Sequence, residues 1–282
     1  MLDIGEHIEV LLPPPRLDAL AVCAIFRRVE NIPVATPLRS DVQANAYGCL
    51  NLICEGSVQL PGRGSLPSLF LTGPFSAPLE TEVTGSLRSA SVVIQPWVLP
   101  HLTGLPAVDL VDRILPLHPE EHEGLEHVVA AARQMNDDPA ATNALWKGLA
   151  TFLSSKGSIV EPQLALSVLR SDGVQAAAAE CSVSERQYRR RFVHAMGLGP
   201  STWVRVTRMQ HVMESMSAGK TGSVSALAVD SGYADQAHLS REAQALVWQS
   251  PKALQRILQG EGKLAWSLHA ARPICSRRNR SG

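Results

Sequence analysis

Four arginines lie close together within residues 184–196, where they could bind the phosphates and base edges of DNA. Arg186 and Arg189 are three residues apart, so a helix over this segment would present both on one face, one turn apart. The guanidinium fork matches the O6 and N7 atoms of guanine in the major groove. Arg190 and Arg191 flank that face and suit phosphate contacts, with internal pairing as an alternative for Arg190. This pattern predicts binding to double-stranded DNA.

The same pattern recurs 51 residues further along the chain. Seven positions keep this offset: Tyr188, Arg190, Phe192, Gly197, Pro200, Trp203 and Arg205 correspond to Leu239, Arg241, Ala243, Trp248, Pro251, Leu254 and Arg256. Each block follows a short alanine-rich segment, residues 174–181 and 224–231, and then a small residue, Ser182 or Gly232. A short helix, a tight turn and a second helix make the helix-turn-helix plan. The sequence therefore predicts two such units.

The second unit offers weaker chemistry at the matching positions. Gln236 could read adenine and Ser240 a base or a phosphate, whereas Ala237 offers only a methyl contact and Arg241 matches Arg190. We expect His238 beside them to be structural or to contact phosphate. The first unit should therefore supply most of the sequence specificity.

A helix beginning at Pro200 should join the two units. Trp203, Val206 and Met213 recur at helical spacing and predict an apolar face. A rigid link matters because two recognition helices reach successive major-groove faces only when they lie about 34 Å apart on one side of the duplex.

The blocks 184–200 and 232–241 resemble the AraC/XylS transcription regulators, and the resemblance spans about residues 168–256. It implies a seven-helix domain whose DNA-facing positions are Arg186, Arg189, Arg190, Gln236, Ala237, Ser240 and Arg241. It also implies structural roles for Tyr188, Phe192, Gly197, Pro200, Trp203, Gly232, Leu239, Trp248 and Pro251. Ala243 and Trp248 stand where the family usually has phenylalanine and glycine. The missing ring would cost up to about 3–5 kcal/mol unless a group such as Trp248 fills the space.

The N-terminal half has the pattern of short strands. Residues 22–29, 48–54, 69–72, 79–83 and 89–94 are rich in β-forming residues and separated by Gly and Pro clusters. A small antiparallel barrel or sandwich is the expected fold, similar to a domain found in one AraC subgroup. Two helices between residues 120 and 152, broken at Asp137-Asp138-Pro139, should connect it to the DNA-binding domain. The predicted fold class is α+β.

We divide the chain into a regulatory domain (residues 1–118), a helical connector (119–158), a DNA-binding domain (159–260) and a basic tail (261–282). Residues 1–159 carry 10 basic and 17 acidic side chains, and residues 160–282 carry 16 and 9, so the zero net charge is a cancellation. Such an asymmetry favours a C-terminal half that binds a polyanion.

Five scattered cysteines without paired spacing indicate reduced thiols, and no apolar run is long enough to span a membrane. The N-terminus has no basic segment typical of an export signal. We therefore expect a cytoplasmic protein without a membrane partner.

Motifs for catalysis, metals and cofactors are weak. His122 and His127 are five residues apart, which puts them about 140° apart on a helix, so they cannot share one metal ion. The run Ser217-Ala218-Gly219-Lys220 imitates a β-lactamase motif but fits a loop. We predict no enzyme activity, metal or cofactor.

The sequence thus indicates a sequence-specific transcription regulator. RNA polymerase, a small-molecule effector of the N-terminal domain and a second copy of the chain are the further partners that we expect. Phe26, Tyr47, Phe70, Phe75 and Trp97 would line an effector pocket or, as we favour, fill a core. Two alternatives stay open: an enzyme or ligand-binding domain fused to a degenerate DNA-binding module, and an architectural DNA-binding protein without ligand control.

Overall fold

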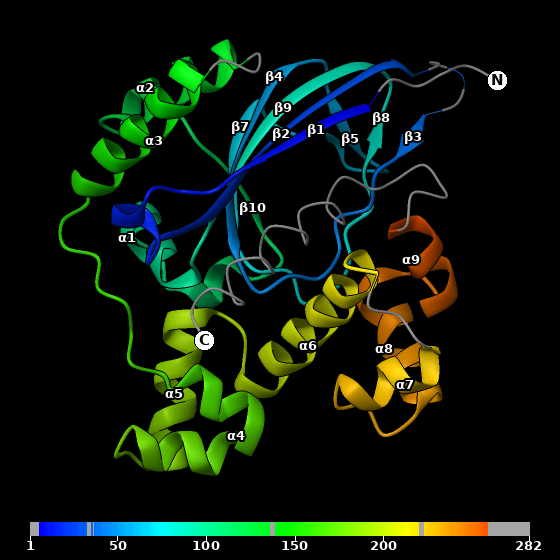
Figure 1. Cartoon of the computed structure of the whole chain (residues 1–282). Coiled ribbons are helices and arrows are strands. Elements are labelled where there is room, and N and C mark those ends of the chain that lie inside the picture. The colour runs from blue at the N-terminus through cyan, green and yellow to red at the C-terminus, as the bar shows by residue number, and fades with distance from the viewer. Residues whose placement is uncertain (1–5, 33–34, 36, 136–138, 220–222, 259–282) are drawn as a thin grey trace. The chain divides into compact units, whose positions relative to one another are not determined.

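The computed structural model describes residues 6–32, 35, 37–135, 139–219 and 223–258 (Figure 1). The chain forms two compact units. The first comprises Met1–Arg39, Tyr47–Gly73 and Thr81–Pro162, and the second comprises Ser40–Ala46, Pro74–Glu80 and Gln163–Gly282. The first is rich in antiparallel strands and the second in helices, which confirms the predicted α+β class. The predicted basic tail and Lys220 of the loop motif lie outside the described residues.

The first unit contains two antiparallel sheets. Their strands are β1 (Glu6–Leu11), β2 (Ala21–Ile32), β3 (Leu38–Arg39), β4 (Gly48–Glu55), β5 (Val58–Leu60), β6 (Gly64–Ser65), β7 (Leu69–Thr72), β8 (Glu82–Val83), β9 (Gly85–Ile94) and β10 (Ile114–Pro116). The larger sheet has the order β1-β2-β9-β4-β7-β10, and the smaller has β3-β8-β5-β6. Because β1 and β10 stand at open edges of the larger sheet, the predicted barrel is not closed.

The strand predictions were best where the apolar runs were longest. β7 coincides with its predicted range, and β2, β4 and β9 contain theirs. The range 79–83 was too long: only Glu82–Val83 is a strand, and Leu79 makes an isolated bridge to Val42. The strands β3, β5, β6 and β10 were missed because two or three residues carry too little periodicity to signal a strand. The six-residue strand β1 was also missed.

A shared apolar core holds the two sheets together. Val29, Phe70 and Leu87 of the larger sheet cluster with Val83 of the smaller, and partly buried Val58 packs against them. Phe70 and Trp97 are buried, as expected for core residues, whereas Phe26 is only partly buried.

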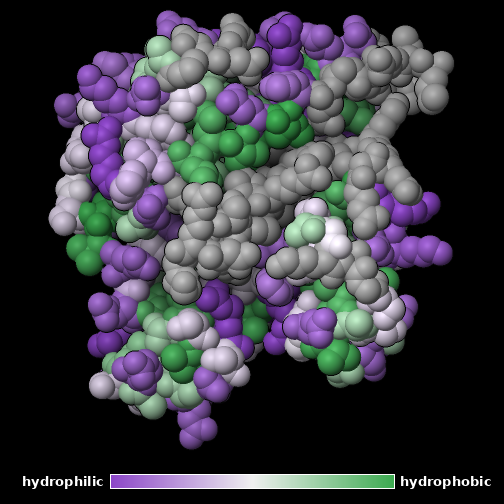
Figure 2. Space-filling view, in the orientation of Figure 1, coloured by the Kyte–Doolittle hydropathy of each residue, from purple (hydrophilic) through white to green (hydrophobic). Residues whose placement is uncertain are grey.

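Two helices, α2 (Leu125–Gln134) and α3 (Pro139–Ser154), follow the sheets and pack against each other. Their apolar stripes are buried, including Leu125, Val128 and Phe152, which confirms that the stripes serve the core. The surface over these helices in Figure 2 is mostly hydrophilic. A short helix, α1 (Leu99–Thr103), precedes them.

The second unit is built from six helices within its described residues: α4 (Leu166–Glu180), α5 (Glu185–Met196), α6 (Pro200–Ser217), α7 (Val224–Asp230), α8 (Gln236–Val247) and α9 (Pro251–Leu258). Gly173 interrupts α4 with φ 83° and ψ −172°, a conformation open to glycine, so α4 is two helices joined at a kink. Counted this way, the unit has the seven helices that the resemblance implied.

Two segments from the N-terminal half of the sequence also belong to the second unit. Ser40–Ala46 and Pro74–Glu80 pair through the bridges Val42–Leu79 and Asn45–Phe75. The backbone N–H of Ala44 donates a hydrogen bond of 3.0 Å to the carbonyl of Leu246 in the last turn of α8. Helix ends leave such carbonyls without intrahelical partners. This pair of segments therefore helps to complete the end of α8.

Candidate nucleic-acid interface

The first helix-turn-helix unit is held by an aromatic core. Tyr188 and Phe192 on α5 are fully buried, with ring centroids 5.8 Å apart, and Phe192 meets Trp203 of α6 edge-on at 5.7 Å. The Tyr188 hydroxyl donates a 2.7 Å hydrogen bond to the carbonyl of Leu164, and burial raises the pKa of Tyr188 to about 12. These contacts set which face of α5 is turned away from the protein.

The start of α5 is capped by the residues of its own first turn. Ser184 accepts a hydrogen bond from the backbone N–H of Gln187, whose side chain accepts one from the Ser184 N–H, forming a capping box. Glu185 follows in the first turn, where a negative charge is favourable. The first turn of the recognition helix is therefore well ordered.

All four arginines of α5 are exposed. Arg189 lies 3.8 Å from Glu185, and both side chains are half exposed, so this ion pair is weak and easily exchanged for a DNA contact. Among the described residues, Arg186, Arg190 and Arg191 have no ion-pair partner. The face opposite the aromatic core is thus a dense cationic surface.

The two turns share one geometry but differ in length. Ser182 and Gly232 both have positive φ, at 53° and 75°. In each turn the residue after them donates a hydrogen bond back to the first helix: Val183 to Ala178 at 3.0 Å, and Tyr233 to Ala228 at 2.9 Å. These donors are 50 residues apart, whereas the recognition helices begin 51 apart, so the second turn holds one extra residue.

In the second unit, two of the side chains predicted to face DNA form hydrogen bonds within the protein. Gln236, Ala237 and Arg241 are exposed on α8. The Gln236 side-chain oxygen accepts a 2.8 Å hydrogen bond from Ser225, and the Ser240 hydroxyl donates one of 2.8 Å to the Gln236 carbonyl. Two of the polar groups that could read bases are therefore already engaged within the protein.

His238 contacts an aromatic ring rather than standing free. Its ring meets Tyr233 edge-on with centroids 5.2 Å apart, and the guanidinium of Arg208 lies 5.4 Å from the centre of the same ring. This packing supports the structural role that the sequence suggested. The Asp235 carboxylate accepts from the His238 N–H at 2.6 Å and caps α8.

A bidentate ion pair that the sequence did not reveal ties α6 to α8. Arg205 donates to the two carboxylate oxygens of Glu242 at 2.8 and 3.0 Å, and these hydrogen bonds raise the pKa of Arg205. The two residues are 37 positions apart, so no local spacing could have signalled the pair. Its geometry orients the second recognition helix relative to α6.

Ala243 and Trp248, the two residues that depart from the family pattern, differ in their burial. Ala243 is buried on α8. Trp248 is only partly buried and forms the C-cap of α8 with φ 56°, matching Gly197 at the end of α5 with φ 75°. A left-handed conformation costs a tryptophan about 1–2 kcal/mol that glycine does not lose.

Helix α6 connects the units and contacts α4, α5, α8 and α9 (Figure 1). It runs from Pro200 to Ser217 and buries Trp203, Val206 and Met213 as predicted. Its 18 residues give a length of about 27 Å. This length is comparable to the roughly 34 Å of one turn of DNA.

Two helix-turn-helix units on one connecting helix, each with a capped second helix, define a DNA-binding domain of transcription regulators. Residues 177–257 match the family model described as a helix-turn-helix domain, which is of the AraC type. Residues 177–257 thus form a helix-turn-helix domain of the AraC type, as the sequence predicted. No curated protein and no solved structure matches the chain.

Two further observations concern other kinds of site. Within the part of the chain that the structure describes, every helix is too short or too polar to cross a lipid bilayer. The described residues also include no group of three His, Cys, Asp or Glu side chains that could hold a metal ion. His122 instead lies 3.3 Å from the Lys156 amine, and burial lowers the His122 pKa.

Proposed function

We propose that this protein regulates transcription by binding a specific DNA sequence through α5 and α8, with α5 providing most of the discrimination. The observation that carries the proposal is the exposure of Arg186 and Arg189, one turn apart on a helix whose Tyr188 and Phe192 are fully buried. Arginine forks on a major-groove helix discriminate guanine by about 1–3 kcal/mol per bidentate contact. Arg190, Arg191 and Arg241 suit phosphate contacts, and Gln236, Ala237 and Ser240 the weaker second half-site.

Selection of bound sites from a random DNA pool, at two salt concentrations, tests this proposal. We expect two unequal half-sites one helical turn apart, and the stronger half should disappear in the double variant Arg186→Ala, Arg189→Ala. Arg191→Ala should weaken all sequences alike and flatten the salt dependence, because it removes a phosphate contact. Arg63→Ala, an exposed arginine of the first unit, is the matched control. If the double variant still selects the same DNA sequence, α5 does not provide most of the discrimination.

We also propose that the N-terminal unit controls DNA binding in response to a small molecule. Support comes from Ser40–Ala46 and Pro74–Glu80, which continue directly into strands of the first unit. Ala44 of the first segment hydrogen-bonds to Leu246 on α8. An effector that favours one arrangement of those strands would shift how α8 is held. Loss of Ala44 amide protection in hydrogen exchange when an effector binds would support this coupling.

The remaining assignments follow from the same role. A regulator that binds genomic DNA acts in the cytoplasm of a bacterial cell. Its further partners in this proposal are RNA polymerase and a second copy of the chain, with which it would form a dimer. We assign no catalytic activity and no cofactor to the N-terminal unit. Size-exclusion chromatography with light scattering, at the concentration used for DNA binding, measures the oligomeric state.

A further inference from the structure

One face of the larger sheet carries a row of charged side chains in cross-strand register. His7 on β1 lies opposite Arg28 on β2, Arg28 lies opposite Arg88 on β9, and Arg88 lies opposite Glu55 on β4. Like charges directly opposite each other on neighbouring strands are destabilising. The two neighbouring arginines in the middle of the row therefore repel each other, and a negative charge beside them would be stabilising.

This row lines a groove of about 560 Å³, a volume within the range of small-molecule sites. Phe26 and Met135 provide apolar lining, and Ala132 and Arg133 border the groove at the end of α2. All of these residues belong to the first unit. The groove thus combines cationic groups with an apolar wall.

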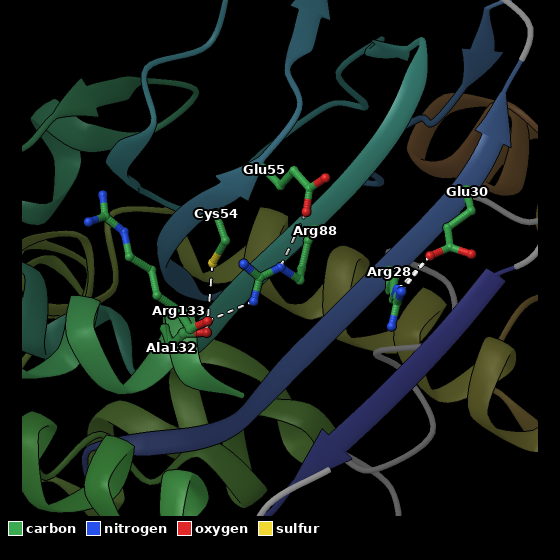
Figure 3. Close-up of polar contacts among 7 residues, drawn as sticks. All are labelled: Arg28, Glu30, Cys54, Glu55, Arg88, Ala132 and Arg133. Atoms are coloured by element: carbon green, nitrogen blue, oxygen red, sulfur yellow. Dashed lines mark hydrogen bonds and ion pairs between the residues drawn. The ribbon is translucent and has the colours of Figure 1, made fainter. Parts of the chain in front are cut away.

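The guanidinium of Arg88 is already held in position (Figure 3). Its Nη1 donates a 2.7 Å hydrogen bond to the carbonyl of Arg133, while its Nε lies 3.7 Å from the Glu55 carboxylate, too far for a hydrogen bond. The Glu55 side chain is 64% exposed, so its hold on Arg88 is weak. Arg88 therefore keeps donors for a bidentate contact with a carboxylate or a phosphate.

The other charges of the groove are partly paired with one another. On the face that carries the row, the lining includes Arg28, Arg88 and Arg133 and the carboxylates of Glu9, Glu30 and Glu55, whereas the buried Arg27 side chain points to the opposite face of β2. Arg28 and Glu30 form an exposed ion pair of 2.6 Å, which salt and solvent screen. Arg133 has no ion-pair partner among the described residues. Arg88 and Arg133 are therefore the groups of the groove that can attract an anion.

Cys54 does not make this groove a reactive centre. Its thiol donates to the carbonyl of Ala132 at 3.7 Å, and burial raises its pKa despite the nearby Arg88 and Arg133. A thiol with a raised pKa stays protonated near neutral pH and is a poor nucleophile. The groove is therefore suited to binding and not to covalent chemistry.

We propose that this groove binds a small organic anion. Its carboxylate or phosphate group accepts two hydrogen bonds from the Arg88 guanidinium, and its apolar part lies against Phe26 and Met135. A bound anion would also offset the repulsion between Arg28 and Arg88. The inference deepens the proposed effector control and rests on it only for what the ligand does to DNA binding. Binding in the groove can be measured without DNA.

Titration calorimetry of the full chain with hexanoate, hexyl phosphate, inorganic phosphate and the neutral hexanamide tests the site. We expect saturable binding of hexanoate or hexyl phosphate, with whichever head group binds more tightly identifying the natural one. Inorganic phosphate should bind more weakly because it lacks the apolar part, and hexanamide should not bind because it lacks the charge. Equal binding of hexanoate and hexanamide, or no saturable binding by any of them, overturns the proposal.

Four variants locate the binding. Arg88→Met should weaken it about tenfold or more, because it removes a bidentate charged contact. Arg133→Met should weaken it several-fold while leaving the Arg133 carbonyl that holds Arg88 in place, and Arg63→Met is the matched control that should change nothing. Glu55→Gln should strengthen binding, since it removes a competing carboxylate, and misfolding cannot produce such a gain. If neither Arg88→Met nor Glu55→Gln changes the affinity, the anion does not bind here.

The outcomes for the groove and for DNA recognition are separable. Anion binding with no selected DNA sequence would contradict the proposed DNA specificity alone. A selected DNA sequence with no anion binding would contradict the groove alone.

Discussion

The two helix-turn-helix units share a plan but differ in what their recognition helices expose and how they are held. Helix α5 shows four arginines and is anchored by the buried rings of Tyr188 and Phe192. Helix α8 shows Arg241 among small or uncharged residues and is held by Arg205–Glu242 and by the Ala44 amide. The comparison teaches that a duplicated fold can keep its geometry while the exposed side chains of its two copies, and the contacts that hold them, differ.

The largest expected effect tests the aromatic anchor of the first unit. Phe192→Ala should lower the free energy of unfolding by about 3–5 kcal/mol, because Phe192 is fully buried against Tyr188 and Trp203. Chemical denaturation of the full chain, followed by tryptophan fluorescence, measures the loss. Val193→Ala, a partly buried neighbour, should cost much less. A similar cost for both variants would contradict the aromatic anchor.

The next effect compares equivalent positions on the two recognition helices. Arg189→Ala should lower the affinity for the selected site by about 1–3 kcal/mol, and its repeat counterpart Ser240→Ala should cost less. The Ser240 hydroxyl already donates to the Gln236 carbonyl, so it offers only its lone pairs to DNA. Fluorescence anisotropy with the selected duplex measures both. A larger loss for Ser240→Ala would reverse the ranking of the units.

A substitution that restores the repeat tests whether the second unit has an empty space. Ala243→Phe should destabilise the protein by about 1–3 kcal/mol if the buried site around Ala243 is already filled. Its neighbours Leu239, Leu246 and Leu254 are all buried, which favours this outcome. A rise in the midpoint of thermal unfolding would instead show that a void remains there.

The hydroxyl groups of two tyrosines should differ in how much they contribute to stability. Tyr188→Phe removes a buried hydrogen bond to Leu164 and should cost about 1 kcal/mol. The hydroxyl of Tyr233 is buried and has no hydrogen-bond partner among the described residues, so Tyr233→Phe should leave stability unchanged or raise it. Denaturation midpoints of the two variants decide between these results. Equal losses would mean that Tyr233 has a partner in solution.

The smallest effect concerns the ion pair that orients α8. Glu242→Gln should cost only about 0.5 kcal/mol of stability, because the Arg205 side chain is 46% exposed and solvent screens the pair. We expect a selective loss at the half-site read by α8, with the half-site read by α5 unaffected. Footprinting across the selected duplex resolves the two halves. A uniform loss across both would argue against an orienting role.

Much of the DNA-binding unit was predictable because its signals are local. The caps, the turn residues and the helical spacing of Trp203, Val206 and Met213 each lie within a few residues of what they determine. Its predicted DNA-facing residues stay a prediction, although their exposure on α5 and α8 is consistent with it. In the strand-rich unit β2, β4, β7 and β9 were found, whereas β1 and the strands of two or three residues were missed, since strand formation depends on neighbouring strands as well as on a strand's own residues.

The sequence by itself determined the two repeated helix-turn-helix units, the break between α2 and α3 and the cationic character of α5, because periodicity, capping and charge are properties of neighbouring residues. Only the tertiary structure decided that Arg205 pairs with Glu242, that Ala44 reaches Leu246, and that strand register sets Arg28 opposite Arg88. Each of these contacts joins residues 37 or more positions apart. Such pairs arise from the packing of whole elements, which no short window of sequence contains.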